Sequence, residues 1–236
     1  MFRVLALALA VFSVATSHPA RQYGWSDMVQ PLAWTTQTAE MDEDEGIILG
    51  PPKVKNHCTA WTYRTPGDPE TLHWITAAHC VADENTHEYD AEDYQIQGEP
   101  VYVETWDVIH DVASLIDYSE AHSGIPSQHI STQNPTVATD PQAPNLTIRG
   151  YPLGYSQLFT TFGYVSVVGR HDETDPDGVV YNVFQVPIAA GSSGSPVYDR
   201  NDRVVGLLQI GWGRGFSSMS GGLSLTALRT FLQDLP

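Results

Sequence analysis

The sequence predicts an all-β fold, either a barrel or a sandwich, that ends in one short helix. Many short runs are rich in Val, Ile, Tyr, Phe and Thr, and each is bounded by Gly, Pro, Asn or Asp. Long helical periodicity is almost absent, and no internal repeat is visible. The 236 residues are enough for one large or two small domains with a sizeable core.

The predicted strands follow one another without alternating helices, which argues against an α/β fold. The helix is expected at residues 225–232, because apolar residues recur there at helical spacing. The strands are expected at residues 72–76, 101–103, 112–116, 146–148, 162–168, 179–186, 196–198 and 204–210.

The first 17 residues have the pattern of a secretory signal peptide. Arg3 precedes an apolar run, and small residues follow at Ala15 and Ser17. The run of about a dozen residues is short for a membrane span, although an uncleaved anchor or a buried helix is the alternative. We therefore expect a secreted protein, extracellular or periplasmic, with no membrane contact once the signal peptide is removed.

Residues 18–46 form an acidic N-terminal segment, with five acids in the six positions from Glu40 to Glu45. Such a run repels itself and is typical of a solvated, poorly ordered segment. A pro-segment or a calcium-binding patch is the alternative. The chain is therefore expected to consist of the signal peptide at 1–17, this segment at 18–46 and a folded domain at 47–236.

The charge balance restricts the partners. Asp and Glu number 28 against 11 Lys and Arg, for a formal charge of −17, and the lysines are Lys53 and Lys55. Affinity for nucleic acid comes largely from Lys and Arg that neutralise phosphates. We therefore expect no nucleic-acid partner, and an anionic membrane surface is disfavoured for the same reason. The mature protein is expected to be a monomer.

The two cysteines, Cys58 and Cys80, are an even count in an exported chain, which favours a disulfide worth about 3 kcal/mol. Two buried free thiols are the alternative, and a zinc site is less favoured because neither cysteine belongs to a C-x-x-C motif. Seven histidines lack metal-ligand spacing, so we expect packing or surface roles for them, no metal and no cofactor. These are His57, His73, His87, His110, His122, His129 and His171.

Three motifs that carry chemistry occur in a fixed order: residues 76–80 (TAAHC), 110–115 (HDVASL) and 191–196 (GSSGSP). A serine hydroxyl is a weak nucleophile at neutral pH and needs a neighbouring base. Histidine can accept that proton near pH 7, and a buried carboxylate fixes the imidazole tautomer. Together the motifs predict nucleophilic catalysis.

The glycine-rich motif also predicts an oxyanion hole. Gly191 and Gly194 permit backbone angles that direct the N–H groups of Gly191 and Ser193 toward one point. A substrate carbonyl oxygen would become negative at that point, and one such donor is typically worth a factor of about 100–1000 in rate.

The order His, Asp, Ser within these motifs resembles that of the chymotrypsin-like (trypsin-fold) serine endopeptidases. Residues 191–198 (GSSGSPVY), 204–207 (VVGL) and 150–152 (GYP) are most similar to the bacterial glutamyl-endopeptidase branch. The resemblance implies two packed six-stranded antiparallel β-barrels and a short C-terminal helix within residues 47–236, with the boundary between barrels at about 125–145.

The resemblance assigns Ser193 as the nucleophile, His79 as the general base and Asp111 as the carboxylate that orients the histidine. Asp107 and Asp117 compete with Asp111 for that last role.

The same resemblance implies that neither Ser192 nor Ser195 is the nucleophile. The family's disulfide beside the histidine corresponds to Cys58 and Cys80.

The sequence departs from the family pattern in two respects. Ser192 stands where trypsin-type zymogens carry the Asp that pairs with a new N-terminus, so removal of residues 18–46 would not build that ion pair. Pro187 and Leu208 stand where charged-residue specificity is set in trypsin-like and glutamyl enzymes. The substrate pocket is therefore expected to accept an uncharged apolar or aromatic side chain. Its predicted residues are Pro187, Ile188, Leu208, Ile210, Gly211 and Gly222.

The sequence as a whole predicts a secreted serine endopeptidase that hydrolyses protein or peptide substrates through an acyl-enzyme. A lipase or esterase of the α/β-hydrolase class would need G-x-S-x-G and the order Ser, Asp, His, which the chain lacks. A catalytically silent binding protein on a protease scaffold is the remaining alternative, because a fold alone does not prove activity.

Overall fold

The computed structural model describes residues 23–36, 39–42, 46–49, 53–82, 93–138, 140, 144–171, 180–211 and 219–236. The signal peptide expected at residues 1–17 lies outside the described residues. In the part of the chain that is described, no helix is long and apolar enough to cross a membrane.

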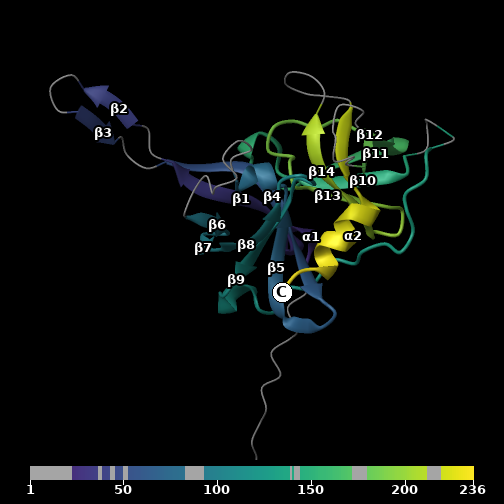
Figure 1. Cartoon of the computed structure of the whole chain (residues 1–236), viewed down its shortest axis with the longest axis horizontal. Coiled ribbons are helices and arrows are strands. Elements are labelled where there is room, and N and C mark those ends of the chain that lie inside the picture. Colours follow the sequence, from purple (N-terminus) through teal and green to yellow (C-terminus); the bar gives the residue numbers. More distant parts are fainter. Residues whose placement is uncertain are drawn as a thin grey trace, which may run out of the picture.

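A seven-stranded antiparallel sheet forms the first half of the molecule, in the order β7-β6-β1-β4-β5-β9-β8 (Figure 1). It curls around an apolar cluster in which Leu32, Trp74 and Leu115 are fully buried. The strands are β1 (Val29–Thr36), β4 (Lys53–Thr65), β5 (Asp68–Thr76), β6 (Tyr94–Ile96), β7 (Glu99–Pro100), β8 (Tyr102–Asp107) and β9 (Val112–Asp117).

The second half is a closed six-stranded barrel in the order β10-β11-β12-β15-β14-β13. Helix α2 (Leu225–Gln233) follows its last strand, starts at the capping hydroxyl of Ser224 and buries Leu228 and Leu232 against the core. The strands are β10 (Leu146–Gly150), β11 (Phe159–His171), β12 (Val180–Gln185), β13 (Pro196–Tyr198), β14 (Val204–Gly211) and β15 (Ser220–Ser224).

The predicted all-β class, the second six-stranded barrel and the C-terminal helix are confirmed. Each predicted strand overlaps a strand of the structure, and the predicted helix falls within α2. The first unit differs from the expected six-stranded barrel, because its described strands form a curled seven-stranded sheet.

The expected start of the domain at residue 47 is too late. Strand β1 pairs with β4 along its whole length, and Val29 and Leu32 are fully buried. Removal of residues 18–46 would therefore take an interior strand out of the sheet. The strand pattern of β1 is hard to recognise in the sequence because Pro31 interrupts it. Pro31 is tolerated because β1 pairs at this position with β4 alone, and its pairing with β6 begins only at Ala33.

The segment before β1 is also part of the fold. Helix α1 (Trp25–Met28) places the Trp25 ring 5.1 Å from the ring of Tyr198 in the second barrel. The guanidinium of Arg149 lies 3.7 Å from the centre of the Trp25 ring, a cation–π contact. The first described residues therefore contact both halves of the molecule.

The acidic run is partly structured, contrary to the expectation of a poorly ordered segment. Strands β2 (Ala39–Asp42) and β3 (Gly46–Leu49) pair as a separate two-stranded sheet that projects from the body in Figure 1. The acids at positions 43–45 lie outside the described residues.

Candidate active site

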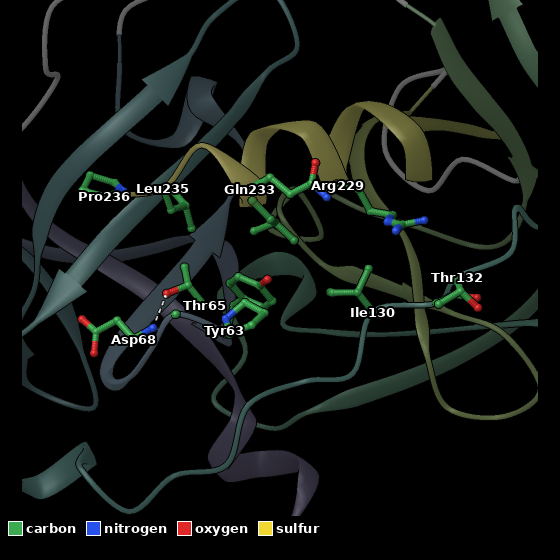
Figure 2. Close-up of a pocket in the computed structure, with 13 residues that line it drawn as sticks. Tyr63, Thr65, Asp68, Ile130, Thr132, Arg229, Gln233, Leu235 and Pro236 are labelled. Atoms are coloured by element: carbon green, nitrogen blue, oxygen red, sulfur yellow. Dashed lines mark hydrogen bonds between the residues drawn. The ribbon is translucent and has the colours of Figure 1, made fainter.

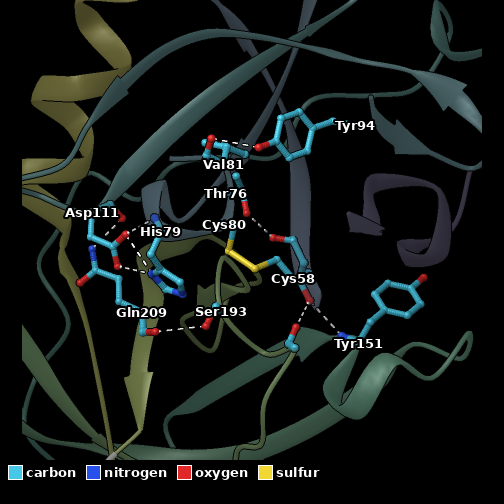
Figure 3. Close-up of a disulfide and its surroundings, with 12 residues drawn as sticks. Cys58, Thr76, His79, Cys80, Val81, Tyr94, Asp111, Tyr151, Ser193 and Gln209 are labelled. Atoms are coloured by element: carbon cyan, nitrogen blue, oxygen red, sulfur yellow. Dashed lines mark hydrogen bonds and ion pairs between the residues drawn. A yellow bond between two sulfur atoms is a disulfide. The ribbon is translucent and has the colours of Figure 1, made fainter. Parts of the chain in front are cut away.

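His79 sits on a short 3-10 turn, η1 (Ala78–Cys80), directly after β5. The turn and the end of β5 before it are each fastened to β4. Cys80 forms a disulfide with Cys58, with 6.2 Å between their Cα atoms, and the Thr76 hydroxyl donates to the Thr59 carbonyl at 2.9 Å (Figure 3). The predicted disulfide is confirmed, and it braces the segment that carries the histidine.

Asp111 contacts His79 through both of its carboxylate oxygens. His79 Nδ1 lies 2.9 Å from Oδ2 and 3.0 Å from Oδ1, and the His79 backbone N–H donates to Oδ1 at 2.9 Å (Figure 3). This arrangement fixes both the ring plane and the tautomer with hydrogen on Nδ1. The two side chains are 27% and 24% exposed, so a substrate can reach them while much of the water is excluded.

The two competing carboxylates bind other histidines. Asp107 Oδ2 lies 2.6 Å from His110 Nδ1. Asp117 contacts His122 Nδ1 and also accepts from Trp74 Nε1 at 3.2 Å. Of the three aspartates, Asp111 is the one that contacts His79.

The Gly191–Ser195 turn needs glycine at two positions. Gly191 has a φ of +90° and Gly194 a φ of +82°, in the region that side chains rarely adopt. A Cβ on Gly194 would also lie 2.1 Å from the Thr59 carbonyl oxygen. Of the three serines in the turn, Ser192 and Ser195 are buried, whereas Ser193 is partly exposed.

Every backbone carbonyl from residue 190 to residue 193 accepts a hydrogen bond. Among the described residues, no acceptor is found for the N–H groups of Gly191 and Ser193. Both N–H groups are thus available to an incoming oxyanion. The carbonyl bonds are Leu153 N to Ala190 O at 2.5 Å, Thr59 Oγ1 to Gly191 O at 3.0 Å, Ser195 N to Ser192 O at 3.0 Å and Thr59 N to Ser193 O at 2.8 Å.

Gln209 of β14 contacts two of the predicted catalytic residues, and the sequence analysis missed it. Its side-chain amide donates to the backbone carbonyls of His110 and Asp111, the latter at 3.0 Å. Its backbone carbonyl accepts from Ser193 Oγ at 3.2 Å. The available signal was that Gln209 is the polar side chain within the apolar strand at residues 204–210. Thr59, which directly follows Cys58, carried no signal of its own.

The predicted pocket residues lie on strands of the second barrel or follow them directly in the chain. Leu208 pairs across β14 and β15 with Gly222, and Ile188 and Leu208 are buried in the same apolar cluster. Gly222 serves close packing, because a Cβ there would lie 2.3 Å from the Leu207 carbonyl. Pro187, Ile210 and Gly211 are exposed. The residues that follow Gly211, at 212–218, lie outside the described part of the chain.

One group of metal-ligating side chains is found among the described residues, formed by Cys58, His79 and Cys80 within 4.8 Å of one another. Both sulfurs belong to the disulfide, so neither is a thiolate ligand.

A cavity of about 590 Å³ lies elsewhere, between α2 and the turn after β4 (Figure 2). Tyr63, Asp68 and Arg229 are among its lining residues, and no member of the predicted triad is. The cavity is therefore separate from the candidate active site.

The sequence model of the trypsin-like peptidase domain matches residues 58–207, which include all three motifs up to the nucleophile turn. The chain belongs to the trypsin-like peptidase family. It is accordingly a serine-type peptidase, as the sequence analysis predicted. No curated protein sequence matches the chain.

Solved structures of trypsin-like peptidases share its fold. The chain is similar to the active form of the Rv3671c protease from M. tuberculosis, with a TM-score of 0.58, 17% identity and coverage of 89% of this chain and 81% of that one. It is also similar to the HtrA-type protease AlgW with a decapeptide, with a TM-score of 0.65, 14% identity and coverage of 89% and 64%. The chymotrypsin-like fold is thereby confirmed. The narrower glutamyl-endopeptidase branch stays a prediction.

Proposed function

We propose that this trypsin-like peptidase is a secreted endopeptidase that cleaves peptide bonds through Ser193, His79 and Asp111. The observation that carries the proposal is the contact of both Asp111 oxygens with His79 Nδ1, at 2.9 and 3.0 Å. Because Nδ1 holds its proton toward the carboxylate, Nε2 is the ring nitrogen that accepts a proton from the nucleophile.

Catalysis starts with a rotation of the Ser193 hydroxyl. Its single proton is donated to the Gln209 carbonyl, so Oγ turns toward His79 Nε2 before it attacks. As Oγ bonds to the substrate carbonyl carbon, Nε2 takes the proton, and the Gly191 and Ser193 N–H groups bind the oxyanion. His79 then gives the proton to the departing amine, which leaves an acyl-enzyme on Ser193. Water that loses a proton to His79 then attacks the acyl carbon. The bond from that carbon to Ser193 Oγ breaks, and His79 returns the proton to Oγ as the acid leaves.

The proposed substrate carries an uncharged apolar or aromatic side chain before the cleaved bond. Support comes from Pro187 and Leu208, which place no charge where related enzymes recognise charged side chains, and from the apolar neighbour Ile188. Cleavage of a peptide library measures this preference directly. A dominance of Arg, Lys or Glu at that position would overturn it.

Secretion and a monomeric state are part of the proposal. Secretion is supported by the signal-peptide pattern of residues 1–17. N-terminal sequencing of exported protein should find a new end after Ser17 or a few residues later, and light scattering should give the mass of one chain. An intact Met1 in exported protein would contradict removal of the signal peptide. The mass of a dimer would contradict the monomeric state.

The deciding experiment is labelling with a fluorophosphonate, which bonds to an activated serine. The wild type should be labelled and Ser193→Ala should not. Asp111→Asn should lower kcat by about 10⁴, whereas the matched Asp107→Asn should retain wild-type kcat, because Asp107 binds His110 instead. A folded wild type that neither labels nor cleaves peptides would indicate a silent binding protein.

A further inference from the structure

We infer that Thr59 is a positioning residue that holds the oxyanion-binding turn in its active shape from across the interface between the two halves. The inference rests on the proposed function, because it concerns how the N–H groups of Gly191 and Ser193 are kept in place.

Thr59 belongs to β4 of the first sheet, whereas the Gly191–Ser195 turn belongs to the second barrel. Its side chain is fully buried. It takes part in four hydrogen bonds with groups at the site. The Oγ1 hydroxyl donates to Gly191 O at 3.0 Å and accepts from Tyr151 N at 3.0 Å. The backbone N–H donates to Ser193 O at 2.8 Å, and the backbone carbonyl accepts from Thr76 Oγ1 at 2.9 Å.

These bonds restrain the peptides next to those that carry the oxyanion-binding N–H groups. In a trans peptide the carbonyl and the following N–H point in opposite directions. Thr59 holds the carbonyl of Gly191 and that of Ser193. The peptide that carries the Ser193 N–H lies between the two peptides held in this way, and its own carbonyl, that of Ser192, accepts from Ser195 N at 3.0 Å. The two Thr59 bonds therefore restrain this peptide indirectly, through the φ and ψ angles that join it to its neighbours.

The hydroxyl is the vulnerable part of this arrangement. Without Oγ1, the Gly191 carbonyl and the Tyr151 N–H lose their partner at a buried position, which is costly. Gly191 lies at a φ of +90° and has no side chain to restrain it, so its peptide can turn to recover a hydrogen bond. Such a turn would move the donors away from the developing oxyanion.

The same network reaches the N-terminal strand. Tyr151, which donates to Thr59 Oγ1 through its backbone N–H, also donates through its phenol to Val29 O at 3.1 Å. Burial raises the pKa of Tyr151 to about 12, with the Asp27 charge as a smaller cause, so the phenol is a donor at neutral pH. Strand β1 and the oxyanion-binding turn are thus joined through Tyr151 and Thr59.

The test compares Thr59→Val with a control on the same strand. Thr62 is also fully buried, and its hydroxyl donates to Pro126 O at 2.8 Å, away from the turn. Thr59→Val should lower kcat by about 10–100-fold with little change in KM, because the donors serve the transition state. Thr59→Ser should restore most of the rate, and Thr62→Val should keep it. Equal kcat values for Thr59→Val and Thr62→Val would overturn the inference.

A spectroscopic measurement separates positioning from a loss of fold. A peptidyl trifluoromethyl ketone adds to the serine Oγ as a hemiketal, whose oxygen loses a proton more easily when the oxyanion donors are aligned. ¹⁹F NMR titration should find this hemiketal pKa raised in Thr59→Val and close to the wild-type value in Thr59→Ser and Thr62→Val. If Thr59→Val does not fold, Thr59→Ala replaces it in the same comparison. An unchanged hemiketal pKa would overturn the inference, whereas a folded wild type that forms no adduct would refute the proposed function itself.

Discussion

The side-chain amide of Gln209 donates a hydrogen bond to the backbone carbonyl of Asp111, with 3.0 Å between Nε2 and O. Asp111 has a φ of +48°, a left-handed conformation that Asp adopts at some cost and that local hydrogen bonds can maintain. Gln209 therefore stabilises the backbone from which the Asp111 carboxylate reaches His79. The same residue accepts from Ser193 Oγ, so it contacts both ends of the proposed triad.

Substitution of Gln209 by Ala should lower kcat by about 10–100-fold, because a small displacement of Asp111 misaligns the base. The downfield ¹H NMR signal of the His79 Nδ1 proton should shift or broaden in the variant. Gln30→Ala is the matched control, since the buried Gln30 amide also donates to a backbone carbonyl, that of Ser26, and contacts no member of the triad in the described hydrogen bonds. Equal losses of kcat in the two variants would show that Gln209 has no positioning role.

Asp117 should make stability depend on pH in the acid range. Burial opposes its ionisation, but hydrogen bonds from His122, the Ser119 N–H and Trp74 outweigh it, so the pKa of Asp117 lies below its usual value. A carboxyl group with a lowered folded-state pKa adds stability above its unfolded pKa of about 3.9 and loses it as pH falls toward the folded value.

Asp117→Asn should therefore lower the free energy of unfolding at neutral pH by about 1–3 kcal/mol and flatten its rise with pH in the acid range. Urea unfolding at a series of pH values measures both effects. High salt should change this pH dependence of the wild-type stability little, because the Asp117 side chain is fully buried. An unchanged slope below pH 5 in the variant would contradict the role assigned to this carboxylate.

Strand β1 should be indispensable to the fold. A chain that begins at Ile47 should fail to fold, because it lacks the strand between β4 and β6. Leu32→Ala should cost about 2–5 kcal/mol by thermal or chemical unfolding, since Leu32 is fully buried. Ser26→Ala, an exposed position just before β1, should have little effect. Wild-type stability in the truncated chain would disprove this assignment.

The disulfide should support activity as well as stability. Replacing Cys58 and Cys80 together by Ser should cost about 2–4 kcal/mol, because the bridge closes a loop between residues 22 positions apart. Since Cys58 precedes Thr59 and Cys80 follows His79, the rate should also fall at temperatures at which the variant is still folded. Circular dichroism and peptidase assays on the same samples separate the two effects. A variant that loses stability but keeps the wild-type rate while folded would show that the bridge has a structural role only.

Much of the fold was predictable where strands carry regular apolar runs. Strands β13 and β14 and helix α2 follow the expected pattern closely, because each has one buried apolar face or is buried throughout. Strand β4 was missed because Cys58, Thr59, Ala60 and Trp61 are all buried, so its faces do not alternate between apolar and polar residues. Strand β15 was missed because its glycines have a low strand propensity. Gly222 instead permits close packing against a neighbouring strand.

The site was predictable to the extent that its chemistry lies in local motifs. His79, Asp111 and the Gly191–Ser195 turn each have a recognisable sequence context. Thr59 and Gln209 do not, because their roles come from hydrogen bonds to backbone atoms far away in the chain. Every residue has a backbone carbonyl, so the sequence does not indicate which carbonyl a side chain will bind. Contacts of this kind are found only in the three-dimensional structure.

The stacking of Arg149 on Trp25, with Tyr198 beside both, joins the first described helix to the last third of the chain. Contacts between residues so distant in sequence slow folding, because a long loop must close before they form. During synthesis helix α1 emerges long before Tyr198, so the Trp25 ring lacks this partner meanwhile. Apolar surface that is exposed in this way until the second barrel is complete favours aggregation of the newly made chain.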